Sequence, residues 1–177
     1  MRTSIRPDEL ARLGRITEEH FVCELGAGHL LLAGGLPIAL ELPRPVRAMT
    51  PAAHATSLWT AALERYFAGE RVTFELDVEA YGAVHGFTDF ELAVYEALAK
   101  VPYGEAVSYR DLAVAAGHPN AYRAVGTAMS RNALPVILPC HRVIRNDGRL
   151  GSYGDDPAWK ERLLALEGVR VVDGRLA

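Results

Sequence analysis

The chain has 177 residues, half of them hydrophobic, which suffices for one packed domain or two small ones. The N-terminal residues are charged and lack the apolar core of a secretory leader, and no later run is long enough to span a bilayer. We therefore expect a cytoplasmic protein. With only Cys23 and Cys140 available, at most one disulfide could form, and we expect both thiols to be reduced.

The formal net charge of −3 hides an uneven distribution along the chain. Residues 1–86 contain 8 Arg and Lys against 11 Asp and Glu, whereas residues 100–154 contain seven basic residues and three acidic ones. A locally positive surface is typical of proteins that bind the phosphate backbone of nucleic acids. An ordinary solvated face would give the same counts, so charge alone leaves both interpretations open.

The first half of the chain is predicted to be a small α/β domain. Short apolar runs at 21–25, 30–33 and 36–42 are separated by glycines, which indicates strands joined by tight turns. From about Pro51 to Gly69 the apolar spacing becomes helical. Residues 75–86 are interpreted as a connector into the second half. We place a supporting domain at 1–84 and a second, mainly helical domain at 85–177, which makes the fold class α+β.

Three side chains of the first half, His20, Cys23 and His29, could be recruited to a metal. Their spacing matches no closed zinc template, and a fourth ligand is missing. The pattern therefore favours buried or incidental side chains over a structural zinc site.

The second half begins with a capping box, in which Thr88 is followed three residues later by Glu91. Apolar residues then recur at helical spacing, which predicts a helix to about Val101. The sequence Pro102-Tyr-Gly104 ends it.

A second cap-like start at Ser108 leads into a short helix that ends at Gly117, and another helical segment covers 121–130. Two short helices joined by a tight turn form a helix-turn-helix pattern. Arg123 is the first long cation of the second helical segment. Any pair of packed helices could show this spacing, but its place in the basic part of the chain favours DNA binding.

An apolar run from Leu134 to Pro139 leads directly into Cys140, His141 and Arg142. The thiolate is the nucleophile of cysteine chemistry, and an unperturbed thiol titrates near pH ~8.5. A working cysteine therefore needs positive neighbours or a base close by. His141 and Arg142 are such neighbours, so we expect the chemistry here.

The C-terminal region contains turn signals at 146–148 and 151–154, followed by a helix capped by Asp155 or Asp156. Gly168 ends this helix, which places Glu167 in its last turn. The helix dipole disfavours a carboxylate there. Glu167 is therefore either simply solvated or held by a specific partner, for which His141 is the chemically sensible candidate.

Six motifs follow one another in the order, and at nearly the spacing, of a known family. They are Val107-Ser-Tyr109, Tyr122-Arg-Ala-Val-Gly126, Arg131-Asn132, Pro139-Cys-His-Arg-Val143, Gly151-Ser-Tyr153 and Leu166-Glu-Gly168. On these residues the chain resembles the O6-alkylguanine-DNA alkyltransferases, also called methylated-DNA–protein-cysteine methyltransferases. The resemblance runs from Phe90 to Gly168, whereas the first half matches only in size and character.

The resemblance implies a catalytic role for each of five residues. Cys140 attacks the carbon on O6 of a damaged guanine and retains it as a thioether. His141 takes the thiol proton through a water, and Glu167 orients the imidazole. Asn132 shapes the active-site turn. Tyr109 pushes the target phosphate and helps to protonate the leaving guanine.

The resemblance also implies how DNA is bound. The O6 substituent lies inside the duplex stack, so the base must be flipped out. The helix-turn-helix enters the minor groove, where Arg123 fills the gap in the stack, Tyr109 contacts the backbone and Tyr122 adds to the contact. Residues that line the pocket around the flipped base are Pro135, Val143, Tyr153 and Gly154.

The implied function is irreversible, stoichiometric repair of double-stranded DNA by a monomer, with no metal or organic cofactor. O6-alkylguanine is the substrate, and O4-alkylthymine is a further candidate. Asp155 departs from the family pattern and places a negative charge near the pocket rim. Three alternatives remain: a lesion-sensing relative, which lacks the cysteine, a helix-turn-helix regulator with a redox-sensing thiol, and a thiol hydrolase.

Overall fold

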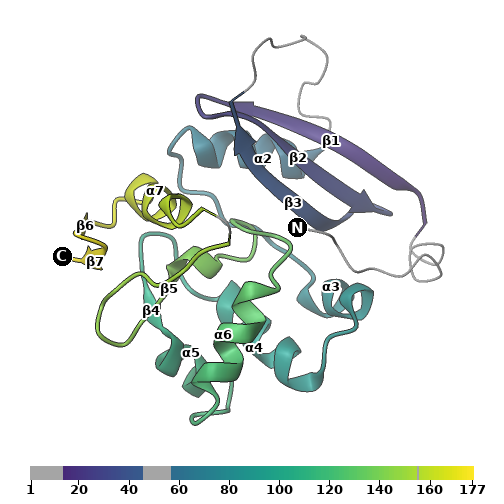
Figure 1. Ribbon diagram of the computed structural model, residues 1–177. Coiled ribbons are helices and arrows are strands. Elements are labelled where there is room, and N and C mark those ends of the chain that lie inside the picture. The colour runs from purple at the N-terminus through teal and green to yellow at the C-terminus, as the bar shows by residue number, and fades with distance from the viewer. Residues whose placement is uncertain (1–13, 46–56, 155) are drawn as a thin grey trace. The chain divides into compact units, whose positions relative to one another are not determined.

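The computed structural model describes residues 14–45, 57–154 and 156–177 (Figure 1). These residues form two compact units, of which the first extends to Gly86 and takes in residues 133–135. The second unit comprises 87–132 and the described residues from Val136 onwards. The first unit contains a three-stranded sheet and the second is mainly helical, which confirms the predicted α+β class.

The sheet of the first unit is an antiparallel meander in the order β1-β2-β3. Its strands are β1 (Ile16–Cys23), β2 (Gly26–Ala33) and β3 (Leu36–Arg44). The β1–β2 register runs without a break, whereas β2 and β3 shift register at two places. Irregular pairing of this kind bends a strand and increases its twist.

All three strands are longer than predicted, and β2 is longer because glycines that we assigned to turns lie inside it. Gly26 has φ +121°, and a Cβ there would come within 2.0 Å of the carbonyl oxygen of Arg44. A Cβ at Gly28 would lie 2.2 Å from the ring of Phe21. These glycines therefore permit close approach between neighbouring strands, a role that glycine also has within sheets.

Helix α2 (Leu58–Phe67) crosses one face of this sheet (Figure 1). The helix begins with a capping box between Ser57 and Thr60. At its other end, the ring of Phe67 stacks on the ring of Phe21 in β1, with the centroids 5.6 Å apart. The predicted start of this helix near Pro51 lies outside the described residues. The stacked pair fixes the helix to β1 through burial of two aromatic side chains.

The predicted connector at 75–86 is wrong, because it contains helix α3 (Val78–His85). The Asp77 side chain accepts from the backbone N–H of Ala80, and Gly86 ends the helix with φ +64°. Val84 packs into a small apolar cluster with Ala33 and Ile38. The helix has only eight residues, too few for a clear periodic signal, and it is stabilised by this packing on the sheet.

The second unit contains the four helices that the sequence predicts in this region. They are α4 (Asp89–Ala99), α5 (Tyr109–Ala115), α6 (Tyr122–Ser130) and α7 (Ala158–Leu166). Helix α4 has the predicted capping box between Thr88 and Glu91. At α7, Asp156 accepts from the backbone N–H of Ala158, and Asp155 lies outside the described residues.

Short elements lie between and after these helices. Strands β4 (Val107–Ser108) and β5 (Val143–Ile144) form a parallel pair, and β6 (Val171–Val172) and β7 (Arg175–Leu176) form a hairpin. A 3₁₀ turn, η1 (Cys140–Arg142), precedes β5. Helices α5 and α6 pack against each other as the predicted helix-turn-helix. Within the described parts of the chain, no helix combines the length and apolar composition needed to cross a membrane.

Replacement of Thr88 by alanine tests the cap of α4. The Thr88 hydroxyl accepts from the N–H of Glu91, whose carboxylate accepts from the N–H of Thr88. Thr88→Ala removes the acceptor for one of these donors, and we expect the free energy of unfolding to fall by about 1 kcal/mol in guanidinium denaturation. Thr88→Ser keeps the hydroxyl and should stay close to the wild type. Equal losses in both variants would contradict the capping role.

Candidate active site

Cys140 opens the η1 turn and is only 7% exposed. The side-chain amide of Asn132, two residues after α6, donates both to the Leu138 carbonyl at 2.8 Å and to the Cys140 sulfur at 3.0 Å. One amide therefore holds the loop before the cysteine and supplies a hydrogen-bond donor to its sulfur. Val136 in the same loop has φ +76°, a conformation costly for a β-branched residue, which its burial holds in place.

Glu167 lies directly after α7 and is fully buried as a side chain. Its carboxylate accepts from His141 Nε2 at 2.8 Å and from two nitrogens of Arg142, Nε at 2.9 Å and a terminal nitrogen at 2.8 Å. The backbone N–H of Gly104 donates to it at 3.0 Å. The guanidinium and the amide thus offset the unfavourable position of a carboxylate at a helix C-terminus.

Arg142 reaches beyond the carboxylate to a loop that the sequence pattern did not connect with the site. Its other terminal nitrogen donates to the carbonyl of Val101 at 2.6 Å, and its guanidinium lies 5.8 Å from the centre of the Tyr103 ring. The loop after α4 is therefore tied to η1 through one arginine. Sequence could not reveal this, because the partners are a backbone carbonyl and an aromatic ring about 40 residues away.

Burial and hydrogen bonding set the protonation states of Cys140, His141 and Glu167. Burial raises the pKa of the Cys140 thiol, although hydrogen bonds from Asn132 and with Tyr153 and the nearby Lys160 act against it. Burial lowers the pKa of His141 despite its bond to Glu167. For Glu167, burial raises the pKa, but hydrogen bonds from His141 and Arg142 outweigh it and keep the pKa well below its ordinary value.

These directions fix the histidine tautomer at neutral pH. An ionised carboxylate only accepts hydrogen bonds, so His141 Nε2 must carry the hydrogen that points to Glu167. The lowered pKa keeps the imidazole neutral, which leaves Nδ1 unprotonated and basic. The site thus combines a protonated thiol, a neutral imidazole base and a carboxylate that orients it.

Lys160, a residue of α7 that is 1% exposed, was not among the site residues predicted from the sequence. Its Nζ donates to the carbonyl of Val143 at 2.5 Å and lies 5.9 Å from the centre of the Tyr109 ring. Burial lowers its pKa to about 8, against the attraction of Cys140. A signal was present, because Lys160 shares one helix face with Leu163 and Leu164, and a lysine on an apolar face is unusual.

The four predicted pocket residues are not all brought together in the second unit. The Tyr153 hydroxyl lies 3.8 Å from the Cys140 sulfur, and Val143 is fully buried in β5, three residues after the thiol. Gly154 is exposed and has φ +49°. Pro135 is half-buried and belongs to the short segment that clusters with the first unit.

The predicted DNA-contacting residues lie at the starts of α5 and α6. Tyr109 is the first residue of α5 and is half-buried. Its pKa is raised, mainly by burial and also by the negative charge of an ionised Cys140, and the opposing effect of Arg145 is smaller. Tyr122, 41% exposed, and the exposed Arg123 open α6, with the guanidinium 5.7 Å from the centre of the Tyr122 ring. The helix-turn-helix therefore presents an aromatic ring and a cation side by side.

The parallel strand pair connects the thiol to this helix-turn-helix. Val107 pairs with Val143, one strand running directly into Tyr109 and the other following directly from η1. Two residues of pairing thus hold the start of α5 beside the cysteine turn.

Comparison with known proteins finds matches over most of the chain. Residues 89–169 match the family model described as "6-O-methylguanine DNA methyltransferase, DNA binding domain". A methylated-DNA–protein-cysteine methyltransferase of Methanosarcina barkeri is 47% identical over 105 residues, which are 59% of this chain and 63% of that relative. The match thus spans less than two thirds of the relative's length.

Longer matches come from Mycobacterium tuberculosis. Its protein of the same name is 39% identical over 142 residues, covering 80% of this chain and 83% of the relative. A crystal structure of M. tuberculosis OGT in complex with DNA superposes with a TM-score of 0.67 at 35% identity, covering 85% of this chain and 92% of that one. The similarity therefore includes the first unit as well as the second.

Replacement of Glu167 by alanine tests the buried ion pair. We expect Glu167→Ala to lower the free energy of unfolding at pH 7 by about 3–5 kcal/mol, because Arg142 keeps a buried charge without its acceptor. Since the folded-state pKa of Glu167 is lowered, this contribution is complete above its ordinary value near pH ~4.3 and is lost as pH falls further. Denaturant unfolding between pH 3 and 7 measures both effects.

The matched control is Glu161→Ala, which removes an exposed glutamate from α7, the helix that directly precedes Glu167. It should change stability by no more than about 0.5 kcal/mol. A similar loss in both variants, or a Glu167→Ala effect that persists unchanged at pH 3, would contradict the ion-pair account.

Proposed function

The chain belongs to the methylated-DNA–protein-cysteine methyltransferase family, and from this premise we propose that it repairs DNA by transferring a methyl or larger alkyl group from O6 of guanine to Cys140. O4-alkylthymine is a further candidate substrate. The observation that carries the proposal is the buried thiol, held by Asn132 and followed in the chain by an imidazole that Glu167 orients. This is the arrangement of nucleophile, base and orienting carboxylate.

In the proposed step the Cys140 sulfur attacks the carbon attached to O6. A carbon–sulfur bond forms, the carbon–oxygen bond breaks, and its electrons leave with the guanine. The thiol proton passes through a water to Nδ1 of His141, the nitrogen that does not face Glu167. The raised pKa of Tyr109 keeps its hydroxyl protonated, so it can supply a proton to the leaving guanine.

Two charged groups support formation of the thiolate. Arg142 keeps Glu167 ionised, and the ionised carboxylate stabilises the imidazolium that forms when His141 accepts the proton. Lys160 is positive below its pKa of about 8 and attracts the developing negative charge on sulfur. A thioether does not readily revert, so each molecule reacts once, and the step needs no metal or organic cofactor.

DNA binding is assigned to the helix-turn-helix of α5 and α6. The target base must leave the stack to reach a thiol that is 7% exposed, which costs a few kcal/mol. We propose that Arg123 enters the minor groove and fills the gap, with Tyr122 beside it and Tyr109 against the target phosphate. The basic composition of 100–154 favours contact with the phosphate backbone.

In this proposal residues 85–177 form the alkyltransferase domain and 1–84 a supporting domain. Val143, Tyr153 and Gly154 of the second unit line the pocket for the flipped base. The protein acts as a monomer in the cytoplasm on double-stranded DNA. Lesion-sensing relatives without the cysteine are disfavoured because Cys140 is present, and a redox regulator would not need the Glu167–His141 pair.

Intact-protein mass spectrometry tests the transfer. After incubation with an oligonucleotide containing O6-methylguanine, we expect a gain of one methylene, about 14 Da, because each cysteine can accept only one methyl group. Cys140→Ala should show no gain, whereas Cys23→Ala, which removes the other free cysteine, should gain mass as the wild type does. Unchanged mass with intact lesion binding would overturn the transfer and indicate a sensor.

The proposed role of Arg123 is tested by comparing duplex and single-stranded substrates. Arg123→Ala should slow alkyl transfer from a duplex by about tenfold or more, because the gap in the stack is no longer filled. Transfer from a single strand, which has no such gap, should change little. Arg162→Ala removes an equal charge from an exposed position of α7 and controls for net charge. Equal loss on both substrates would contradict the role.

A further inference from the structure

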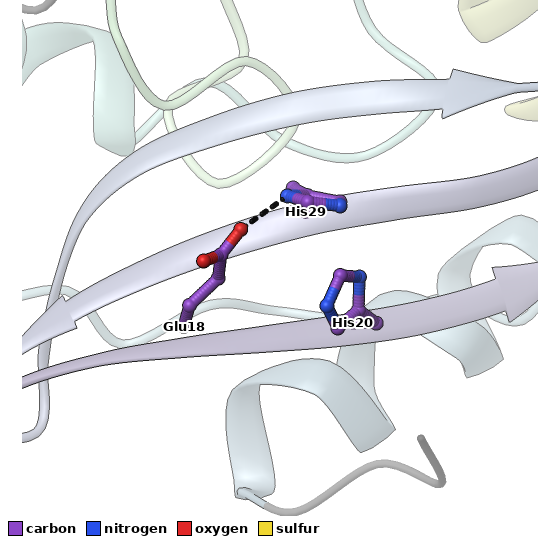
Figure 2. Close-up of side chains that lie close together, drawn as sticks. All are labelled: Glu18, His20 and His29. Carbon is purple, nitrogen blue, oxygen red and sulfur yellow. Dashed lines mark ion pairs between the residues drawn. The ribbon is translucent and has the colours of Figure 1, made fainter. Parts of the chain in front are cut away.

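We propose that Glu18, His20 and His29 form a binding site for a divalent transition-metal ion of the zinc type on the sheet of the first unit. His20 on β1 lies directly opposite His29 on β2 in the antiparallel register. Glu18 precedes His20 by two residues, so both side chains point to the same face of the strand. Figure 2 shows the three side chains gathered over the two strands.

The distances between these groups are close to those that a metal requires. Glu18 Oε1 lies 2.8 Å from His29 Nδ1, and the two imidazole centroids are 4.0 Å apart with planes at 87°. One ligand atom from each residue can be chosen so that all lie within 4.8 Å of one another. Tetrahedral ligands about 2.0–2.2 Å from Zn²⁺ are separated by roughly 3.4 Å, so small side-chain rotations suffice.

The donor set indicates the class of ion. Two imidazoles and one carboxylate suit Zn²⁺ and related transition metals, whereas Mg²⁺ and Ca²⁺ prefer sites built from oxygen alone. Three protein ligands leave a fourth position for water, as in open zinc sites. Glu41 pairs with His29 from β3, and its carboxylate adds negative charge beside the site.

The scaffold explains why this trio differs from the one considered from the sequence. Side chains alternate between the faces of a strand, so Cys23 points to the face opposite His20. Glu18, on the same face as His20, is the third ligand instead of Cys23. The two strands pair without interruption from Ile16 to Cys23, which fixes the positions of all three ligands on a regular backbone.

A simple ion pair accounts for only part of the cluster. Glu18 and His29 are both substantially exposed, with side chains 55% and 42% accessible, and an exposed pair contributes at most about 1 kcal/mol. That pair does not involve His20, whose ring approaches His29 edge-on. A metal ion shared by the three would replace this direct pair, bring His20 into the same site and connect β1 to β2.

The test uses the full chain, freed of metal by chelation and titrated with Zn²⁺ by calorimetry and with Co²⁺ by absorption. We expect one ion per chain in the first unit, d–d absorption from cobalt, and no sulfur-to-cobalt charge-transfer band from this site. His20→Ala and His29→Ala should each weaken binding at least tenfold. Zn²⁺ should also raise the melting temperature, because it binds only the folded sheet.

Two controls separate this site from other ligands. Cys23→Ala should bind as the wild type does, because its thiol faces away from the cluster. His118→Ala, which removes an exposed histidine of the second unit, should also leave binding unchanged. The proposal is overturned if no stoichiometric binding occurs, if binding survives both cluster variants in chains shown to be folded by circular dichroism, or if Cys23→Ala abolishes it.

Discussion

The active-site half of the molecule depends on one buried carboxylate. Glu167 receives hydrogen bonds from His141, Arg142 and the backbone of Gly104, and so joins the end of α7, the cysteine turn and the loop after α4. Burying two opposite charges is costly, and only geometry that satisfies nearly every donor and acceptor offsets that cost. The carboxylate that stabilises this junction also orients His141, while burial keeps the imidazole neutral, so folding and the proposed proton transfer share one group.

The strand pair β4–β5 transmits this order to α5 and α6, the helices proposed to bind DNA. Two residues of parallel pairing would not be stable alone, but they are flanked by the buried turn at Cys140 and by the start of α5 at Tyr109. The proposed nucleophile and proton donor are therefore set by backbone pairing rather than by long side chains. Preorganisation of this kind matters because small displacements of reacting groups lower rates steeply.

Local signals in the sequence were sufficient for the helices of the second half and for the cysteine turn. The Thr88 capping box, the helix-turn-helix spacing and the misplaced charge of Glu167 each act within a few residues, so they can be read from the chain. Helix α3 and the full length of β2 depend on packing between distant segments, which local patterns do not contain. The hydrogen bond between Arg142 and Val101 likewise joins distant segments, so local patterns do not reveal it. Lys160, in contrast, could have been found from its position on the apolar face of α7.

The burial of Cys140 also bears on selectivity between electrophiles. A thiol reacts with peroxides and other small oxidants chiefly as its thiolate, and the raised pKa keeps that form scarce in the resting protein. The sulfur also accepts a hydrogen bond from Asn132, and the residue is only 7% exposed, so small oxidants in solution have little access to it. The proposed reaction consumes this residue in a single event. Low reactivity in the resting protein therefore preserves the free thiol until an alkylated base reaches it.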